Sequence, residues 1–385
     1  MTKHTLTLGS LFDGSGGFPL AGTLLGIEPK WASEIEPFPI RVTTKRFPQM
    51  KHYGDVSKIN GALIDPVDVI TFGSPCQDLS SNGKRAGLEN GERSHLFYEA
   101  IRIIKEMRQT THNRYPRFLV WENVPGAFTS NRGEDFHSVL ESLAGIKDGT
   151  ITIPRSKGWQ KAGRILGDDF TLCWRVLDSQ YWRTAQRRRR LFVTVDLDRR
   201  SPEMLFESQN FHWDFEPLTG ERQRIAGVSE ASVATPSRAT VLGDTYSFDP
   251  QAWRDCGAYV LKDVSNPLKV CTRQAVAYET PGGYVARRFS ATECARLQGF
   301  PDWWCAGLET ATPTDEEVER WQSIWDNWCD INNLKRKTTE QVKRWLTDPY
   351  TESAEYKLWG NGVALPCVHF VLAGFVEIMK EEEKE

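Results

Sequence analysis

The sequence predicts an α/β protein with a doubly wound, mostly parallel sheet and a second, smaller, partly β domain. From residue 5 to about 196, apolar runs alternate with helical stretches, which is typical of parallel strands joined by helices. A glycine-rich turn follows the first of these runs, as at the ligand-binding edge of such sheets. Residues 201–286 are instead turn-rich and dotted with aromatic side chains, and this change of character indicates the second domain.

The first domain is expected to contain five strands, at residues 6–12, 31–34, 67–72, 118–121 and 191–195. A helix is expected at residues 96–107, where Leu96, Ile101, Ile104 and Met107 recur with helical spacing after Ser94, a suitable N-cap. The apolar segment 363–378 near the end of the chain is expected to return to the core of this domain.

Two capping boxes mark a pair of helices between residues 314 and 346. Thr314 with Glu317 and Thr338 with Gln341 have the required spacing. Tryptophans 321, 325 and 328 fall with Val318 on one helical face. This pattern predicts a helical hairpin that packs on the body of the protein through its tryptophans, rather than an aromatic binding box.

Composition restricts the class of protein. The 385 residues carry a net charge of −3, and the eight cysteines include no Cys-x-x-Cys pair, which argues against a metal site or a disulfide framework. No apolar run reaches membrane-spanning length, and residues 1–5 pass into a strand without a signal-peptide core, so we expect a cytoplasmic protein without membrane contact. Arginines crowd one segment, at 183, 187–190, 199 and 200, which indicates either a polyanion contact or a solvated face.

The glycine-rich turn at residues 13–17 favours an adenosine-containing cofactor without phosphates. A dinucleotide fingerprint would need a third glycine where Pro19 stands, which disfavours a nicotinamide cofactor and a dehydrogenase. Glu34 ends the second strand, where an acid can bind ribose hydroxyls. Asp55 follows the next expected strand and is either a contact to the adenine edge or a turn residue. S-adenosylmethionine satisfies all three positions.

Cys76 follows the strand at 67–72, and the intervening Pro75 makes the turn stiff. Glu122 follows the strand at 118–121, so both side chains are expected at the same edge of the sheet. A thiol and an acid that converge there suggest covalent attack with proton transfer. The alternatives are a half-buried structural cysteine and a glutamate that caps a turn.

In their order, these residues resemble the motifs of the DNA (cytosine-5)-methyltransferase family. Phe12–Gly17 resembles its first motif, Pro75-Cys76-Gln77 its catalytic loop and Glu122-Asn123-Val124 its Glu-Asn-Val. The later matches are Gln186–Arg190 with Gln-x-Arg-x-Arg, residues 288–301 with the motif after the recognition region, and Gly360–Val363 with Gly-Asn-Ser-Val. The resemblance spans residues 5–306 and 355–378. It implies a Rossmann-like, S-adenosylmethionine-dependent methyltransferase fold.

The resemblance also implies roles for individual residues. The catalytic residues would be Cys76, Glu122, Arg188 and Arg190: Cys76 attacks carbon-6 of a flipped-out cytosine, Glu122 serves N3 and Arg190 holds O2. The residues that would bind S-adenosylmethionine are Phe12, Asp13, Gly14, Gly16, Gly17, Glu34, Ile35, Asp55, Val56, Ser74, Pro75, Leu96, Asn361 and Val363. Those that would contact DNA are Gln77, Ser80, Lys84, Arg85, Asn123, Gln186 and Leu268.

The resemblance divides the chain into a catalytic domain at 1–200 completed by 355–385, a target-recognition domain at 201–306 and a helical insertion at 307–354. Its expected partner is double-stranded DNA, bound by a monomer, with a restriction endonuclease of the same target site as a further candidate partner. Carbon-5 then receives the methyl group, and loss of its proton releases Cys76.

Two departures from the family pattern stand out. Gly362 occupies the place of the usual serine, and Pro267 that of a threonine beside Leu268 in the recognition region. Two rival functions remain. A tRNA cytosine methyltransferase of the same fold usually carries a Cys-Phe-Thr triplet, which this chain lacks. A catalytically inactive DNA-binding homologue is the other, against which the intact Cys76, Glu122 and Asn361 argue.

Overall fold

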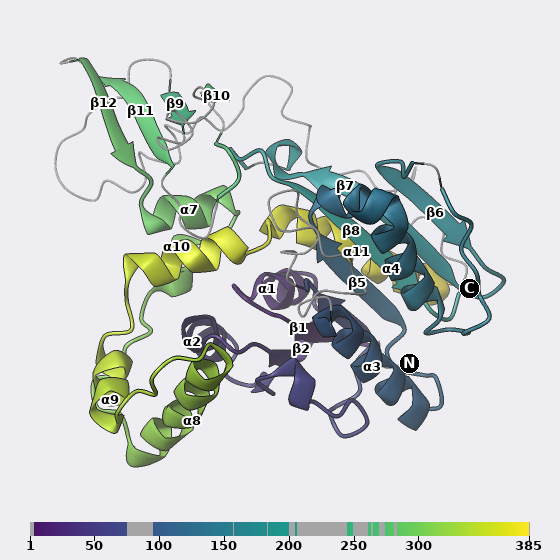
Figure 1. Cartoon of the computed structure of the whole chain (residues 1–385), viewed down its shortest axis with the longest axis horizontal. Coiled ribbons are helices and arrows are strands. Elements are labelled where there is room, and N and C mark those ends of the chain that lie inside the picture. The colour runs from purple at the N-terminus through teal and green to yellow at the C-terminus, as the bar shows by residue number, and fades with distance from the viewer. Residues whose placement is uncertain are drawn as a thin grey trace.

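The first domain is built on one eight-stranded sheet, seen in the computed structural model of the chain (Figure 1). The structure describes residues 4–74, 95–156, 158–182, 184–199, 205, 245–248, 261–262, 265–268, 274–280 and 283–384. The strands follow the order β3-β2-β1-β4-β5-β8-β7-β6. Their bounds are Thr7–Leu11 (β1), Glu28–Ser33 (β2), Lys51–His52 (β3), Val69–Phe72 (β4), Phe118–Asn123 (β5), Ala162–Leu166 (β6), Thr171–Asp178 (β7) and Arg189–Asp196 (β8).

The sheet combines a parallel part with an antiparallel edge. Strands β3, β2, β1, β4 and β5 are parallel neighbours, whereas β8, β7 and β6 each pair antiparallel with the strand before them. All five strands expected from the sequence are present, and the α/β fold with a mostly parallel sheet is confirmed. The sequence pattern did not indicate β6 and β7.

Successive residues of β5 point to opposite faces of the sheet and belong to two separate hydrophobic cores. Phe118 and Val120 join the core made with helices α1 and α11, whereas Leu119 and Trp121 join the core made with α3 and α4. Helices therefore cover both faces of the sheet, and α11 packs on α1 as the apolar segment at 363–378 predicts. These helices are Gly17–Leu24 (α1), Pro37–Arg46 (α2), His95–Thr110 (α3), Glu134–Ala144 (α4) and Leu365–Glu382 (α11). The expected N-cap Ser94 lies outside the described residues.

A second, antiparallel sheet lies within residues 245–288, inside the expected recognition domain. Its order is β10-β9-β11-β12, with bounds Leu261–Lys262 (β10), Thr245–Phe248 (β9), Ala275–Thr280 (β11) and Gly283–Arg288 (β12). Figure 1 shows it apart from the central sheet, with helix α7 (Ala291–Leu297) beneath it. The domain boundaries themselves remain a prediction.

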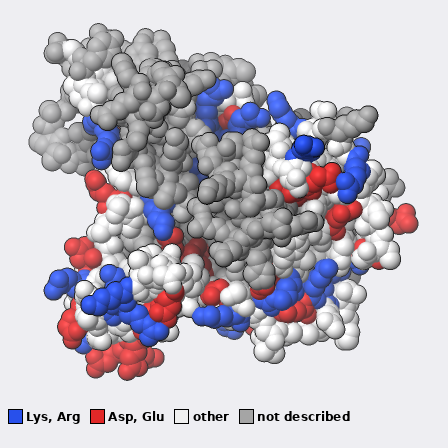
Figure 2. Space-filling view, in the orientation of Figure 1, with Lys and Arg blue, Asp and Glu red and all other residues white. Residues whose placement is uncertain are grey.

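The two capping boxes begin two helices, α8 (Asp315–Ile331) and α9 (Thr339–Thr347), as predicted. They form a separate lobe in Figure 1, and Figure 2 shows that this lobe carries both signs of charge. Its small core contains Val318, Trp321, Val342 and Leu346 and closes on Ile40 of α2. The hairpin therefore packs on the body of the protein, partly through its tryptophans.

Helix α10 (Glu352–Asn361) leads from this lobe back to α11. Among the described residues, no single helix is both long and apolar enough to cross a membrane; α10 and α11, bent by 42°, meet that test only as a pair. Short 3-10 turns complete the secondary structure at Val56–Lys58, Pro125–Phe128, Ser130–Gly133, Ser179–Tyr181 and Asp302–Cys305.

Candidate active site

The carboxyl ends of β1, β2, β4 and β5 lie at the same edge of the sheet, because these strands are parallel. The turn at residues 12–17 follows β1, Glu34 follows β2, and Gly73 and Ser74 follow β4. Glu122 is the penultimate residue of β5. The structure thus brings the turn at 12–17, Glu34, Ser74 and Glu122 to one edge of the sheet.

Glu122 faces the end of β4. A Cβ on Gly73 would lie only 3.2 Å from Glu122 Oε2, so the carboxylate lies directly against the backbone that leads to Cys76. Across the strand pair, Arg190 Nε of β8 is 3.0 Å from Glu122 Oε1, an ion pair between two largely buried side chains. Burial nevertheless raises the pKa of the Glu122 carboxyl, and the guanidinium groups of Arg190 and Arg188 only oppose this effect. Burial therefore favours the protonated form of the Glu122 carboxyl.

Gly73 was not singled out by the sequence analysis, although it begins the stretch that ends at Cys76. Its position directly after a buried strand is the available signal, because a residue without a Cβ there lets a neighbouring side chain approach the backbone. Ser74 is buried beside it and accepts a hydrogen bond from Trp121 Nε1 at 3.3 Å.

Arg188 has a different environment from Arg190. Its side chain is 2% exposed, and its guanidinium donates to the carbonyl oxygens of Leu268 at 3.4 Å, Gly360 at 3.2 Å and Gly362. The three carbonyls come from the segment after β10 and from the end of α10. Arg188 thus joins both segments to the catalytic sheet, which is the geometry of a positioning residue.

The turn after β1 is tightly enclosed. Phe12 adopts φ 57°, a left-handed conformation that is uncommon and strained for an aromatic residue. Gly16 has φ 76° and is the N-cap of α1, and a Cβ there would lie 2.7 Å from Thr43 Cγ2. A Cβ on Gly17 would overlap Val363 Cγ2, so Val363 of the motif at 360–363 lies directly over the turn.

Asp13 is the unusual residue of this turn. It is 6% exposed, and neither carboxylate oxygen has a hydrogen-bond partner among the described residues. Burial raises its pKa to about 7, with the nearby charge of Glu34 adding to the shift and Ser10 opposing it. A buried acid without a partner is the kind of group that a bound polar ligand satisfies.

Glu34 is half-buried, and backbone amides bind both of its oxygens. Oε2 accepts from Gly14 N at 2.9 Å, and Oε1 accepts from Ile35 N at 2.7 Å and Glu36 N at 2.9 Å. Burial still raises the pKa of this carboxyl. Oε2 keeps a second lone pair for a hydroxyl donor.

Asp55 is a turn residue that also lines a cavity. Its Oδ1 accepts hydrogen bonds from the backbone and the hydroxyl of Ser57, so it caps the following 3-10 turn. Together with Glu34 and Ile35, it also lines a cavity of about 420 Å³. Val56 is buried and Leu96 half-buried in the core beneath this edge, whereas Asn361 is exposed at the last position of α10.

These features fit S-adenosylmethionine. The enclosed glycine turn permits close approach of a ligand to the backbone, Asp13 lacks a partner, and Glu34 and Asp55 lie on the wall of one cavity. Among the described residues, no group of three His, Cys, Asp or Glu side chains is arranged to hold a metal ion.

Three of the expected DNA contacts are buried. Asn123 accepts a hydrogen bond from Val124 N at 2.8 Å through its own Oδ1, which shapes the turn after β5. Gln186 is fully buried beside Ser265, and Leu268 is 3% exposed. Gln186 and Leu268 lie where the central sheet meets the segment after β10, and none of the three side chains lies on an open surface. The side-chain amide of Gln186 has no partner among the described residues. The remaining predicted residues, Pro75, Cys76, Gln77, Ser80, Lys84 and Arg85, lie outside the described part of the chain.

The departure at Gly362 has a structural counterpart in Ser15. A Cβ at position 362 would lie 3.0 Å from Ser15 Oγ and 3.1 Å from the Leu358 carbonyl oxygen. Ser15 is buried, so its hydroxyl occupies space beside the position where the family usually has a serine. At the other departure, Pro267 is exposed and its carbonyl accepts a hydrogen bond from Gln274 at 2.7 Å.

The chain is similar in sequence to known methyltransferases. The profile of the family described as C-5 cytosine-specific DNA methylase matches residues 6–147. A protein of Escherichia phage P1 named DNA N-6-adenine-methyltransferase is 32% identical over 253 residues, which are 58% of this chain and 33% of that protein. The type II methyltransferase M.MspI of Moraxella sp is 25% identical over 300 residues, covering 76% of this chain and 61% of that protein. The chain thus spans a third of the first relative and about three fifths of the second.

The fold has counterparts among solved structures. The S. pombe Dnmt2 methyltransferase superposes with a TM-score of 0.56 over 97% of this chain and 99% of that one, at 16% sequence identity. This likeness concerns the fold alone. The family profile covers the first β-α units, and the match to the type II methyltransferase extends over three quarters of the sequence; both support the DNA (cytosine-5)-methyltransferase family for this chain.

Proposed function

We propose that the protein transfers a methyl group from S-adenosylmethionine to carbon-5 of a cytosine in double-stranded DNA. The observation that carries this proposal is the buried Glu122, which is paired with Arg190 and lies against Gly73, three residues before Cys76. Carbon-5 of cytosine is a weak nucleophile until a thiolate adds to carbon-6. An acid beside the cysteine loop is the group that this activation requires.

The name of the phage P1 relative raises methylation of the adenine amino group as an alternative. An exocyclic amine carries its own lone pair, so it needs neither a cysteine nucleophile nor an acid that serves a ring nitrogen. The match to that protein also covers only a third of it. The Glu122–Arg190 pair lies against Gly73, which precedes Pro75-Cys76-Gln77 in the sequence, and this favours cytosine as the substrate base.

Three side chains would carry out the reaction on the cytosine. The Cys76 thiolate forms a bond to carbon-6 while Glu122 supplies a proton or hydrogen bond to N3, and Arg190 holds both Glu122 and the O2 oxygen. After methylation, the carbon-5 proton leaves and its electron pair re-forms the ring double bond, which breaks the bond to Cys76. A thiol is only a few per cent ionised at neutral pH, so Cys76 has to lose its proton before or during attack.

S-adenosylmethionine supplies an electrophilic sulfonium methyl group when it is bound. The turn at 12–17, with Val363 over it, and the carboxylates of Asp13, Glu34 and Asp55 would hold it. Half-buried and buried apolar side chains at Ile35, Val56 and Leu96 would support its adenine ring.

Attack on carbon-6 requires that the cytosine leave the duplex, which costs a few kcal/mol of stacking and pairing. Lys84, Arg85 and the exposed Arg187 and Arg189 would contact phosphates, so binding should weaken steeply with salt. Residues 201–306 would read the target sequence, where a wrong base pair typically costs about 1–3 kcal/mol. The protein would act as a cytoplasmic monomer, with a restriction endonuclease of the same target site as a candidate partner.

A trapping experiment tests the proposal. The full chain is mixed with S-adenosylmethionine and duplex DNA in which 5-fluorocytosine replaces cytosine, since fluorine cannot leave as a proton does. We expect a covalent complex with the wild-type protein and none with Cys76→Ala. Cys173→Ala is the matched control, because burial raises the pKa of the Cys173 thiol to about 12 and that residue should be inert.

The methylated nucleoside distinguishes the rivals. Mass spectrometry of digested substrate should find 5-methylcytosine in duplex DNA. Labelling of tRNA alone would favour the tRNA enzyme, and N6-methyladenine would favour the adenine alternative. Absence of cofactor binding by calorimetry would favour an inactive DNA-binding homologue.

A further inference from the structure

The cavity beside Glu34 and Asp55 has a second wall that the catalytic domain does not provide. Its inner wall comes from the ends of β2 and β3 and includes His52. Its outer wall consists of side chains from α8, of which Arg320 and Ile324 face only this cavity. The helical insertion therefore encloses the region where the proposed cofactor site places its adenosine half.

The outer wall is fixed in place by contacts on both sides of the cavity. On one side, Arg41 of α2 donates to the Leu308 carbonyl at 2.8 Å and lies 5.4 Å from the ring centroid of Trp321, a buried residue of α8. On the other side, Lys58 Nζ donates to Asn327 Oδ1 at 2.6 Å. These contacts link the insertion to α2 and to the turn that Asp55 caps, so they fix the position of α8 relative to the inner wall of the cavity.

The chemistry of the cavity suits a nucleoside. The negative charges of Glu34 and Asp55 are balanced by two cations, Lys58 beside Asp55 and Arg320 on α8. Ile35 and Ile324 supply apolar surface. Burial lowers the pKa of His52 to about 4, and the charge of Arg320 adds to this shift, so His52 is neutral near pH 7. Balanced charge, apolar side chains and hydrogen-bond donors together favour a flat heteroaromatic base with a sugar and disfavour a phosphate or a simple ion.

We propose that α8 of the insertion forms the outer wall of the adenosine end of the cofactor site, with Arg320 and Ile324 as positioning residues for the adenosine half. This inference rests on the proposed function, because it assumes that Glu34 and Asp55 bind S-adenosylmethionine. It gives the residues between 307 and 354 a role in cofactor binding.

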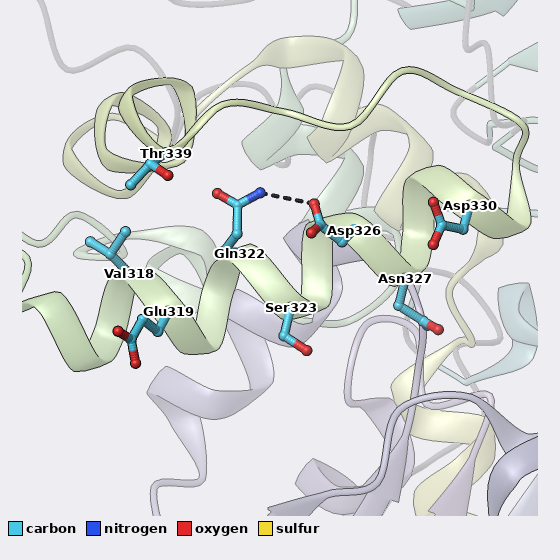
Figure 3. Close-up of a pocket in the computed structure, with 8 residues that line it drawn as sticks. All are labelled: Val318, Glu319, Gln322, Ser323, Asp326, Asn327, Asp330 and Thr339. Carbon is cyan, nitrogen blue, oxygen red and sulfur yellow. Dashed lines mark hydrogen bonds between the residues drawn. The ribbon is translucent and has the colours of Figure 1, made fainter.

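The outward face of the same helix offers a matched control. Figure 3 shows a second pocket along α8, which Glu319 and Asp330 line, whereas Arg320 and Ile324 line only the cavity beside Glu34 and Asp55. In this pocket Gln322 donates to Asp326 at 2.8 Å. Glu319 is exposed and does not line the cavity, so its replacement changes a charge on α8 without changing the proposed wall.

The test measures binding by calorimetry with the full chain, using S-adenosylhomocysteine and 5′-methylthioadenosine, which lacks the amino-acid half. We expect Arg320→Ala to weaken both ligands about tenfold, Ile324→Trp to weaken both further, and Glu319→Ala to change neither by more than about twofold. Equal losses for the two ligands would place the effect at the adenosine end. Arg320 is exposed, so the Arg320→Ala variant should fold even if the Ile324→Trp variant does not.

A second measurement uses S-adenosylhomocysteine that carries a benzyl group on the adenine amino nitrogen. Ile324→Ala should bind it at least tenfold more tightly than the wild type does, because the variant enlarges the cavity. If Arg320→Ala and Ile324→Ala behave like Glu319→Ala with every ligand, the inference is wrong. If the wild-type chain binds none of these ligands and no S-adenosylmethionine, the proposed function itself fails.

Discussion

Glu122 and Arg190 form an ion pair of 3.0 Å in which burial still raises the pKa of the acid. The two residues come from β5 and β8, which pair antiparallel, and the side chains meet at the strand ends. The pair therefore keeps the carboxyl oriented while its environment disfavours the charged form. Our first prediction concerns this balance.

Glu122→Gln should lower the rate of methylation by about 10²–10⁴-fold, the usual range for loss of a general acid. The protonated acid is the working form, so wild-type activity should fall as pH rises through the raised pKa of Glu122. A plot of kcat/KM against pH should lose this basic limb in Glu122→Gln. A variant that melts at a lower temperature but keeps a wild-type rate and pH profile would show that Glu122 is only structural.

Arg188→Met should destabilise the protein by about 3–5 kcal/mol, because it leaves buried carbonyl oxygens without a donor. The neighbouring Arg189 is exposed, and Arg189→Ala should change stability by no more than about 0.5 kcal/mol. Urea denaturation of both variants measures the difference. Equal stability of the two variants would contradict the junction role of Arg188.

Asp13→Asn should make the protein more stable than wild type at pH 8 but not at pH 4. Burial raises the pKa of Asp13 from 3.8, the ordinary value of an aspartate, to about 7 in the folded protein, so ionisation costs stability progressively as pH rises from about 4 to 7. Above pH 7 the difference should reach at most about 4 kcal/mol. Thermal unfolding of both proteins across this pH range gives the test, and a constant difference at all pH values would refute it.

Gly362→Ser should destabilise the protein by about 1–2 kcal/mol, because its Cβ would crowd Ser15 Oγ and the Leu358 carbonyl. Ser15→Ala removes the first of these contacts, so it should recover part of the loss in the double variant. A double-mutant cycle measures the coupling. Strictly additive effects would mean that the two positions do not interact.

The sequence predicted where the strands end and that the site residues at these ends lie at one edge of the sheet. Glu34 and Glu122 follow apolar runs, and parallel strands bring their carboxyl ends to one edge. The environment of Arg188 was not predictable, because its carbonyl partners are 80 to 174 residues away in the chain. The burial of Gln186 and Leu268 has the same cause, since both lie where two domains meet. Capping boxes predicted the start of α8, but no local pattern indicates that Arg320 faces a cavity beside Glu34.

The Arg188 guanidinium connects two parts of the molecule that are distant in the sequence. Arg188 holds the carbonyl of Leu268, beside the second sheet, and the carbonyls of Gly360 and Gly362, next to Val363 over Gly17. A displacement of Leu268 therefore either breaks a charge-assisted hydrogen bond in a dry interior or pulls on the turn above Gly17. Arg188 therefore couples the position of the small sheet to the packing of Val363 on the glycine turn.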